Sequence, residues 1–325
     1  MVAEYYTRKQ ASLRYALFFT FGVLGPCISG LLAYGIRNMN GTQGLEGFRW
    51  IFILEGLITI FVSFLIYILV PNFPEKTDIL NASEKQHLLA TLRHDKGDQK
   101  LGNRKTNWLR MIFDYKILFP TVLFFCCDMT AASMGSFIPT ILTELGWTAA
   151  RAQVMSIPVW LCGMMCQILG ASLSARVGWR FPFILVGNIL ATIGWIINVL
   201  YSEKRDISAA VRYLSLFCMS AGTFIQMTMT TSWLTNNLRG RPSVAVGTAV
   251  VLGLGNCANL VSSNVFINKE APHYPTAFRT GLGLSTTGGV VGFIYIGLLW
   301  RHNQQLRGRR EHGGQDTESD YIYQY

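Results

Sequence analysis

The sequence predicts an all-α protein that crosses a membrane about eight times. Half of its 325 residues are hydrophobic, only 14% are charged, and the mean hydropathy is +0.31. A chain this apolar belongs largely inside a bilayer rather than around one soluble core. Apolar runs of about 20 residues, long enough to cross the hydrocarbon as helices, recur along it. They lie near residues 13–36, 50–70, 117–142, 154–175, 181–201, 209–236, 243–267 and 281–300.

We expect four parts along the chain. The first two spans form one unit at 1–71, and the other six form a second unit at 117–302. The segment 72–116 between them is charged and carries the capping-box pattern SEKQ from Ser83, which predicts a structured connector with a short helix. The polar segment 303–325 predicts a disordered tail.

The basic residues predict the orientation of the chain. Its net charge of +10 would suggest nucleic-acid binding in a soluble domain, but here the Lys and Arg residues cluster between apolar runs, and no nucleic-acid partner is expected. All but eight of the 28 lie in the N-terminus, the connector, two short turns and the tail. Cytoplasmic loops are enriched in Lys and Arg, so both termini are predicted to be cytoplasmic.

The distribution of cysteine and histidine argues against an enzyme. All seven cysteines fall inside apolar runs, and no two of them show metal-ligand spacing with a histidine nearby. All five histidines lie outside the runs, which leaves the membrane interior without the usual general base. We therefore expect no catalytic activity, no metal and no cofactor.

The segment 226–264 carries more amide and hydroxyl groups than lipid would tolerate, arranged on two helical faces. The first face has Gln226, Thr230, Trp233 and Asn237, and the second has Asn256, Asn259 and Ser263. The intervening LRGRP sequence at 238–242 predicts a hairpin, so we expect both faces to turn toward one interior.

Two interpretations of these faces remain open. Polar stripes inside membrane spans either line a water-filled path or hold neighbouring helices together. Neutral donors and acceptors beside an aromatic wall suit a small organic anion or weak acid. On the first interpretation the solute-binding residues are Gln226, Thr230, Trp233, Asn237, Asn256 and Asn259.

Two acidic residues are candidates for proton coupling. Asp128 lies about a third of the way into the third apolar run, where an uncompensated carboxylate is costly. A proton relay and a structural hydrogen bond to a neighbouring helix explain it equally well. Glu55 lies five residues beyond Trp50, near the outer end of its span, and for it we favour a structural contact.

Several segments resemble fungal transporters of the major facilitator superfamily, in the anion:cation symporter branch that includes allantoate permeases and nicotinic acid transporters. Residues 48–75 resemble the sixth helix of that family through the Arg-Trp-Ile-Phe-x-x-Glu-Gly core and a Pro-x-x-Pro exit. Further resemblances, in the family's order, cover 6–14, 30–36, 136–158, 232–241 and 255–276. In two places the sequence departs from the family: the turn at 171–180 has Ala175 where an acidic residue is usual, and Pro242 interrupts a usual Lys-Arg pair.

The resemblance implies a fold and a function. The family has twelve spans in two six-helix lobes, and this chain starts where the fifth span begins, so we expect two helices of the N-terminal lobe and a complete C-terminal lobe. The implied activity is proton-coupled transport of a small organic anion, carboxylate or vitamin-like solute by alternating access, in a monomeric multi-pass protein of the plasma membrane. The alternative is a truncated membrane protein whose cavity is incomplete and which transports nothing.

Overall fold

A computed structural model of the chain describes residues 5–37, 41–70, 74, 80–96, 111–204, 207–238, 240–271 and 273–311. The regular secondary structure in these residues is helical, which confirms the predicted fold class. The long helices are α2 (Arg8–Arg37), α3 (Gly47–Leu69), α4 (Ala82–Lys96), α6 (Tyr115–Glu144), α7 (Ala149–Val177), α8 (Phe181–Lys204), α9 (Ala209–Asn237), α10 (Arg241–Gly255), α11 (Ala258–Val265) and α12 (Pro275–Glu311). Two short 3-10 turns, η1 (Thr42–Gly44) and η2 (Asn268–Glu270), lie between them.

Each predicted apolar run corresponds to a helix, except that the seventh is divided into α10 and α11. Among the described residues, six segments are long and apolar enough to cross a membrane: Gly47–Leu69, Tyr115–Glu144, Arg151–Val177, Phe181–Glu203, Pro242–Val265 and Pro275–Gly308. Helix α9 does not reach the same mean hydropathy. The chain is therefore a polytopic α-helical membrane protein.

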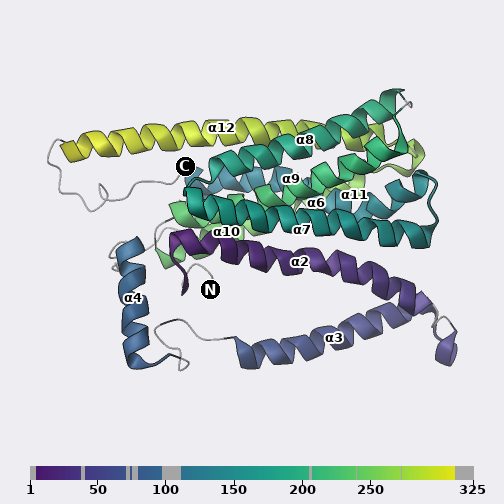
Figure 1. Ribbon diagram of the computed structural model, residues 1–325, viewed down its shortest axis with the longest axis horizontal. Coiled ribbons are helices and arrows are strands. Elements are labelled where there is room, and N and C mark those ends of the chain that lie inside the picture. The colour runs from purple at the N-terminus through teal and green to yellow at the C-terminus, as the bar shows by residue number, and fades with distance from the viewer. Residues whose placement is uncertain are drawn as a thin grey trace.

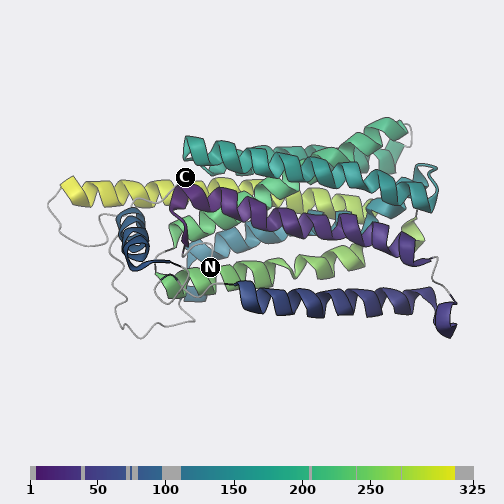
Figure 2. The ribbon, with the colours of Figure 1, turned by 60° about the horizontal axis from the view of Figure 1, so that its bottom comes forward.

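The most polar of the long helices, α9, is also the most enclosed. All but three of the residues from Ser215 to Asn237 are buried. Helices α6, α7 and α8 pack around it, and α2 touches it from a further side (Figure 1, Figure 2). Lipid cannot satisfy hydroxyl and amide groups, so a helix of this composition is stable in a membrane only when other helices cover it.

Helices α8 and α9 approach so closely that their backbones meet at two glycines. A Cβ atom built on Gly187 would lie 2.7 Å from the carbonyl oxygen of Gly222, and one built on Gly222 would meet the carbonyl oxygen of Gly187. Small residues at such crossings allow backbone-to-backbone packing in membranes.

Helix α3 lies at the edge of the bundle, joined to α2 at one end (Figure 1, Figure 2). None of its residues is buried, and its main contacts are with α2. Phe52, Phe61 and Tyr67 are among its many exposed side chains. In a bilayer these apolar side chains are compatible with lipid, so their exposure costs little.

Helix α12 continues to Glu311, whereas the sequence predicted a disordered tail from residue 303. Asn303 and Leu306 are buried, and Leu306 belongs to the apolar cluster that also contains Ala16 of α2. These two residues, three apart, keep one face of the helix against the bundle. The rest of the tail, 312–325, lies outside the described residues.

The connector contains the predicted short helix, but its cap differs from the prediction. The side chain of Glu84 accepts a hydrogen bond of 3.0 Å from the backbone N–H of Asn81, so the capping box starts at Asn81 rather than at Ser83. Helix α4, the start of α2 and the end of α12 lie at the same end of the molecule (Figure 1). This arrangement agrees with an even number of crossings.

The glycine crossing gives a first prediction. In Gly222→Ala the added methyl group meets the backbone of α8, which cannot rotate away, so we expect a loss of about 1–3 kcal/mol in the free energy of unfolding. Thermal unfolding in detergent micelles measures it. The control is Gly135→Ala on α6, where a Cβ atom would have no neighbour within 4 Å. Equal stability of the two variants would contradict the proposed close packing.

Candidate functional site

The first predicted polar face lies in the interior of the helix bundle. Gln226, Thr230, Trp233 and Asn237 of α9 are all buried. The ring of Trp233 packs edge-on against Tyr295 of α12, with 4.5 Å between centroids. On this face Trp233 is therefore part of the apolar packing between helices and is not exposed at a surface.

Gln226 lies among the helices beside α9. A Cβ atom on Gly288 of α12 would lie 3.4 Å from Nδ2 of Asn188 and 3.8 Å from Nε2 of Gln226. Asn188 in turn donates a hydrogen bond of 2.9 Å to the carbonyl oxygen of Ser285. Neither Nε2 of Gln226 nor Oγ1 of Thr230 has a protein partner among the described residues. These two atoms are the polar groups on the face whose hydrogen bonds the protein does not supply.

The second predicted face is exposed. Asn256, Asn259 and Ser263 are all exposed, and the helices α10 and α11 to which they belong pack mainly on α6. The structure therefore does not bring the two polar faces to one interior, contrary to the prediction. Helical periodicity correctly grouped the side chains by face, but the neighbour of each face is decided by how the helices pack.

Asp128 and Asn259 are brought together. The carboxylate of Asp128 on α6 is 5% exposed, and Nδ2 of Asn259 donates to its Oδ2 at 3.2 Å. The same nitrogen donates to the backbone oxygen of Asn256 at 3.0 Å. One turn further along both helices, the hydroxyls of Ser133 and Ser262 are hydrogen-bonded at 3.0 Å. The predicted structural hydrogen bond of Asp128 therefore exists, and it joins the carboxylate to the exposed polar face.

Glu55 does not join this group. It is exposed on α3, and Oγ1 of Thr59 donates to its backbone oxygen at 2.7 Å. Its carboxylate makes no hydrogen bond or ion pair within the described part of the chain. The structure thus separates the two acidic residues that the sequence proposed for proton coupling.

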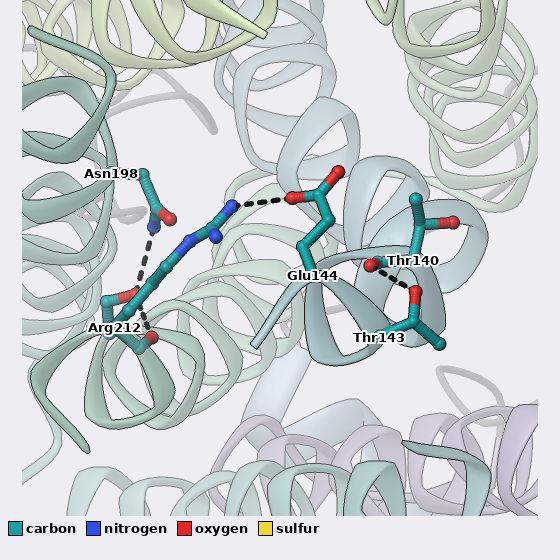
Figure 3. Close-up of polar contacts among 6 residues, drawn as sticks. Thr140, Thr143, Glu144, Asn198 and Arg212 are labelled. Atoms are coloured by element: carbon teal, nitrogen blue, oxygen red, sulfur yellow. Dashed lines mark hydrogen bonds and ion pairs between the residues drawn. The ribbon is translucent and has the colours of Figure 1, made fainter. Parts of the chain in front are cut away.

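A largely buried ion pair between two helices was not predicted from the sequence (Figure 3). Nη2 of Arg212 lies 3.0 Å from Oε2 of Glu144, joining the first turn of α9 to the last residue of α6. The Arg212 side chain is fully buried, and its guanidinium carbon lies 3.8 Å from the ring centroid of Tyr201. Asn198 donates to Oγ of Ser215, which donates to the backbone oxygen of Arg212.

Sequence reasoning placed Arg212 among the basic residues of the outer loops. Its partner lies 68 positions away, and no local pattern links the two. The only available signal was the position of Glu144 at the end of an apolar run, which predicts a boundary but not a contact. Because the pair is shielded from solvent, each charge depends on the other.

A second missed residue, Gln167 of α7, connects the two groups of spans. It is fully buried, and its Nε2 donates to Oγ1 of Thr228 at 2.7 Å and to the carbonyl oxygen of Ala16 at 3.1 Å. These contacts join α7 and α9 to α2. A hydrogen bond between helices in a membrane has little water to compete with it, so Gln167 helps to fix the position of α2.

The turn between α7 and α8 contains a helix-ending glycine followed by a buried arginine. Gly178 ends α7 with a φ of 81°, a conformation that favours glycine. Nη1 of Arg180 then donates to the carbonyl oxygen of Ser174 at 3.3 Å. Burial lowers the pKa of Arg180 to about 10, so its side chain is still charged at neutral pH. Arg180 therefore helps to cap the end of α7.

A bundle of long apolar helices that encloses a polar helix is a polytopic α-helical membrane protein. Residues 1–258 match the Major Facilitator Superfamily, and the chain belongs to that family.

Relatives in fungi are named as transporters. An uncharacterized transporter of Schizosaccharomyces pombe is 28% identical over 312 residues, covering 95% of this chain and 61% of the relative. The high-affinity nicotinic acid transporter of Saccharomyces cerevisiae is 28% identical over 306 residues, covering 93% and 55%. A major facilitator-type transporter of Emericella nidulans is 26% identical over 282 residues, covering 85% and 56%. The chain thus spans little more than half the length of these relatives.

The packing of Trp233 gives the second prediction. In Trp233→Ala the loss of a buried aromatic ring should lower the free energy of unfolding by about 3–5 kcal/mol. Trp300→Ala on the same bundle is the control, because Trp300 is 55% exposed, and its loss should change stability little. Chemical denaturation in mixed micelles measures both. A Trp233→Ala protein as stable as the control would show that the ring is not part of the apolar packing.

The ion pair gives the third prediction. Glu144→Gln leaves the fully buried charge of Arg212 without its partner, so we expect a loss of about 3–5 kcal/mol in the free energy of unfolding. The exposed pair of Arg279 and Glu203 has the same 3.0 Å separation and provides the control. Because both of its members are solvated, Glu203→Gln should leave the midpoint of thermal unfolding unchanged. Equal midpoints for the two variants would mean that burial does not decide the strength of these pairs.

Proposed function

We propose that this protein acts as a secondary transporter that moves a small organic anion, carboxylate or vitamin-like solute together with protons by alternating access. Membership of the Major Facilitator Superfamily supports the transport part of this proposal. A relative named for nicotinic acid, which carries a carboxylate, supports the class of solute. The proposal also places the protein in the plasma membrane as a monomer of the anion:cation symporter branch.

The observation that carries the proposal is the contact between Asp128 and Asn259. Ionisable residues inside membrane spans are expensive and are usually retained for ion or solute movement. Divided helices are where many transporters bind their solute, because the division exposes backbone polar groups near the middle of the membrane. Here a carboxylate in a span contacts a residue directly after such a division.

We assign different roles to the residues that the sequence proposed as a solute site. Asn256 and Asn259 are exposed beside Asp128, so they are our candidates for direct solute contact. The face of α9 with Gln226, Thr230, Trp233 and Asn237 is enclosed. We assign it a structural role, in which it stabilises the packing of α6 and α12 next to the site. Protons are assigned to Asp128 rather than to the exposed Glu55.

The competing hypothesis is a membrane protein that folds but does not transport. The exposure of helix α3 supports this hypothesis, because no residue of α3 is buried against other helices. A solute pathway requires walls on all sides, and α3 contributes little to any wall in this structure. Uptake measurements separate the two hypotheses.

The fourth prediction tests the assigned function in proteoliposomes that contain the full chain and labelled nicotinic acid as the probe solute. We expect accumulation inside the vesicles that depends on an inward proton gradient and disappears with a protonophore. Asp128→Asn cannot release a proton, so it should abolish gradient-driven accumulation while leaving counterflow exchange measurable.

Asp114→Asn is the matched control for that experiment. Asp114 accepts a hydrogen bond from the backbone N–H of Lys116 at the start of α6, far from the divided helix, and asparagine caps helices equally well. It should transport like the parent. Accumulation by Asp128→Asn equal to that of the parent would place the proton elsewhere, and no uptake by any form with several small carboxylates would favour the competing hypothesis.

A further inference from the structure

The chain between α10 and α11 is tightened rather than simply interrupted. Asn256 and Cys257 keep helical angles, but the backbone N–H groups of Cys257, Asn259 and Leu260 bond to carbonyl oxygens three residues earlier, at 3.0–3.2 Å. Such 3-10 geometry inside a helix is weaker than α-helical bonding and often marks a point of bending. We call residues 256–257 the helix break.

The side chain of Asn259 joins this break to α6. An amide nitrogen has two hydrogens, and Nδ2 of Asn259 uses one on Oδ2 of Asp128 and the other on the backbone oxygen of Asn256. An ionised carboxylate only accepts hydrogen bonds, so the amide must present its nitrogen to Asp128. We call this pair of contacts the Asn259 bridge.

We propose that the Asn259 bridge couples the protonation of Asp128 to the bending of α11 at the helix break. This inference rests on the proposed function, because it names the residue through which the proton acts. When a proton from solvent binds Asp128, the charge-assisted hydrogen bond becomes a neutral one, which is roughly half as strong. The carboxyl group also gains an O–H donor that Nδ2 cannot accept. The bridge weakens, and the oxygen of Asn256 at the break loses its fixed side-chain partner.

The contacts between α11 and α6 that do not involve the charge of Asp128 limit how α11 can move. The hydroxyl pair of Ser133 and Ser262 is neutral, so it does not respond to the proton and holds α11 to α6 one turn beyond the bridge. The exposed residues Asn256 and Asn259 lie nearer the helix break than Ser262 does. Protonation of Asp128 then changes the affinity of these residues for a solute, and by linkage the solute changes the proton affinity of Asp128 by the same factor.

Asp128 is the carboxylate of this region. Its own helix carries no other charged residue from 117 to 143, and the helices packed on α6 carry none within 152–175, 213–238, 243–265 and 280–300. The titratable side chains there are thiols and phenols. They are Cys126 and Cys127 on α6, Cys162 and Cys166 on α7, Tyr213 and Cys218 on α9, Cys257 at the break and Tyr295 on α12. As residue types, thiols and phenols lose their protons at a far higher pH than carboxylic acids do.

The fifth prediction tests the bridge by hydrogen–deuterium exchange of the full chain in lipid nanodiscs. Peptides covering residues 252–264 are followed at about pH 5 and about pH 8, with correction for the intrinsic exchange rate, a range in which a membrane carboxyl titrates. We expect the protection of α11 to be about fivefold lower at the acid pH, the size of one weakened hydrogen bond. In Asp128→Asn the protection should be the same at both pH values.

Three further variants make the test specific. Asn259→Leu removes the bridge without changing the carboxylate, so its protection should be low and independent of pH. Ser262→Ala should lower protection equally at both pH values, because that contact carries no charge. Asp114→Asn should keep the pH dependence of the parent. A parent protein with the same protection at both pH values, or an Asn259→Leu protein that keeps the pH dependence, would overturn the proposal.

The hydrogen–deuterium exchange experiment tests the bridge proposal, and the uptake experiment tests the transport proposal, so either proposal can be wrong without the other. If the protein accumulates no solute but α11 shows the expected pH dependence, the bridge exists and the transport proposal is wrong. If proton-driven uptake depends on Asp128 but α11 does not respond to pH, the proton acts through another contact and the bridge proposal is wrong.

Discussion

The structure depends on the enclosure of one polar helix. Helix α9 is rich in hydroxyl and amide groups, and a bilayer offers them neither water nor protein partners. They are stable there only because α6, α7 and α8 surround the helix closely. Two contacts hold these helices together. Gly187 approaches Gly222 closely, and Gln167 donates a hydrogen bond to Thr228. Helix α2 is positioned against the same group of helices, because Gln167 donates to the carbonyl oxygen of Ala16.

Polar contacts within the bundle are of two kinds. At one end, the ion pair of Arg212 and Glu144 is shielded and stacked on Tyr201, which suits a permanent connection between α9 and α6. Near the helix break, Asp128 meets a neutral amide rather than a cation, so its charge is balanced only in part. The fixed and the responsive contacts of α6 are therefore separated along a single helix.

Particular residues show how far sequence reasoning reached. Hydropathy correctly located each helix of the bundle, because span length is set by membrane thickness. Asp128 was identified from its depth alone, and its hydrogen bond to another helix was one of the two explanations offered. For the face of Trp233 the sequence left two interpretations open, because periodicity cannot distinguish a face that borders a pathway from one that borders another helix. The continuation of α12 was missed because Asn303 is polar, and only its buried position reveals that it packs.

The amino-acid sequence determined the all-helical class, the positions of the long apolar helices, and the grouping of polar side chains by face, since all three follow from periodicity and hydropathy over a few turns. The tertiary structure decided which of those faces is covered and which carboxylate meets which amide. Arg212 and Glu144 are 68 residues apart, and Asp128 and Asn259 are 131 apart. Contacts over such separations arise from the crossing of whole helices, and no local pattern in the chain specifies them.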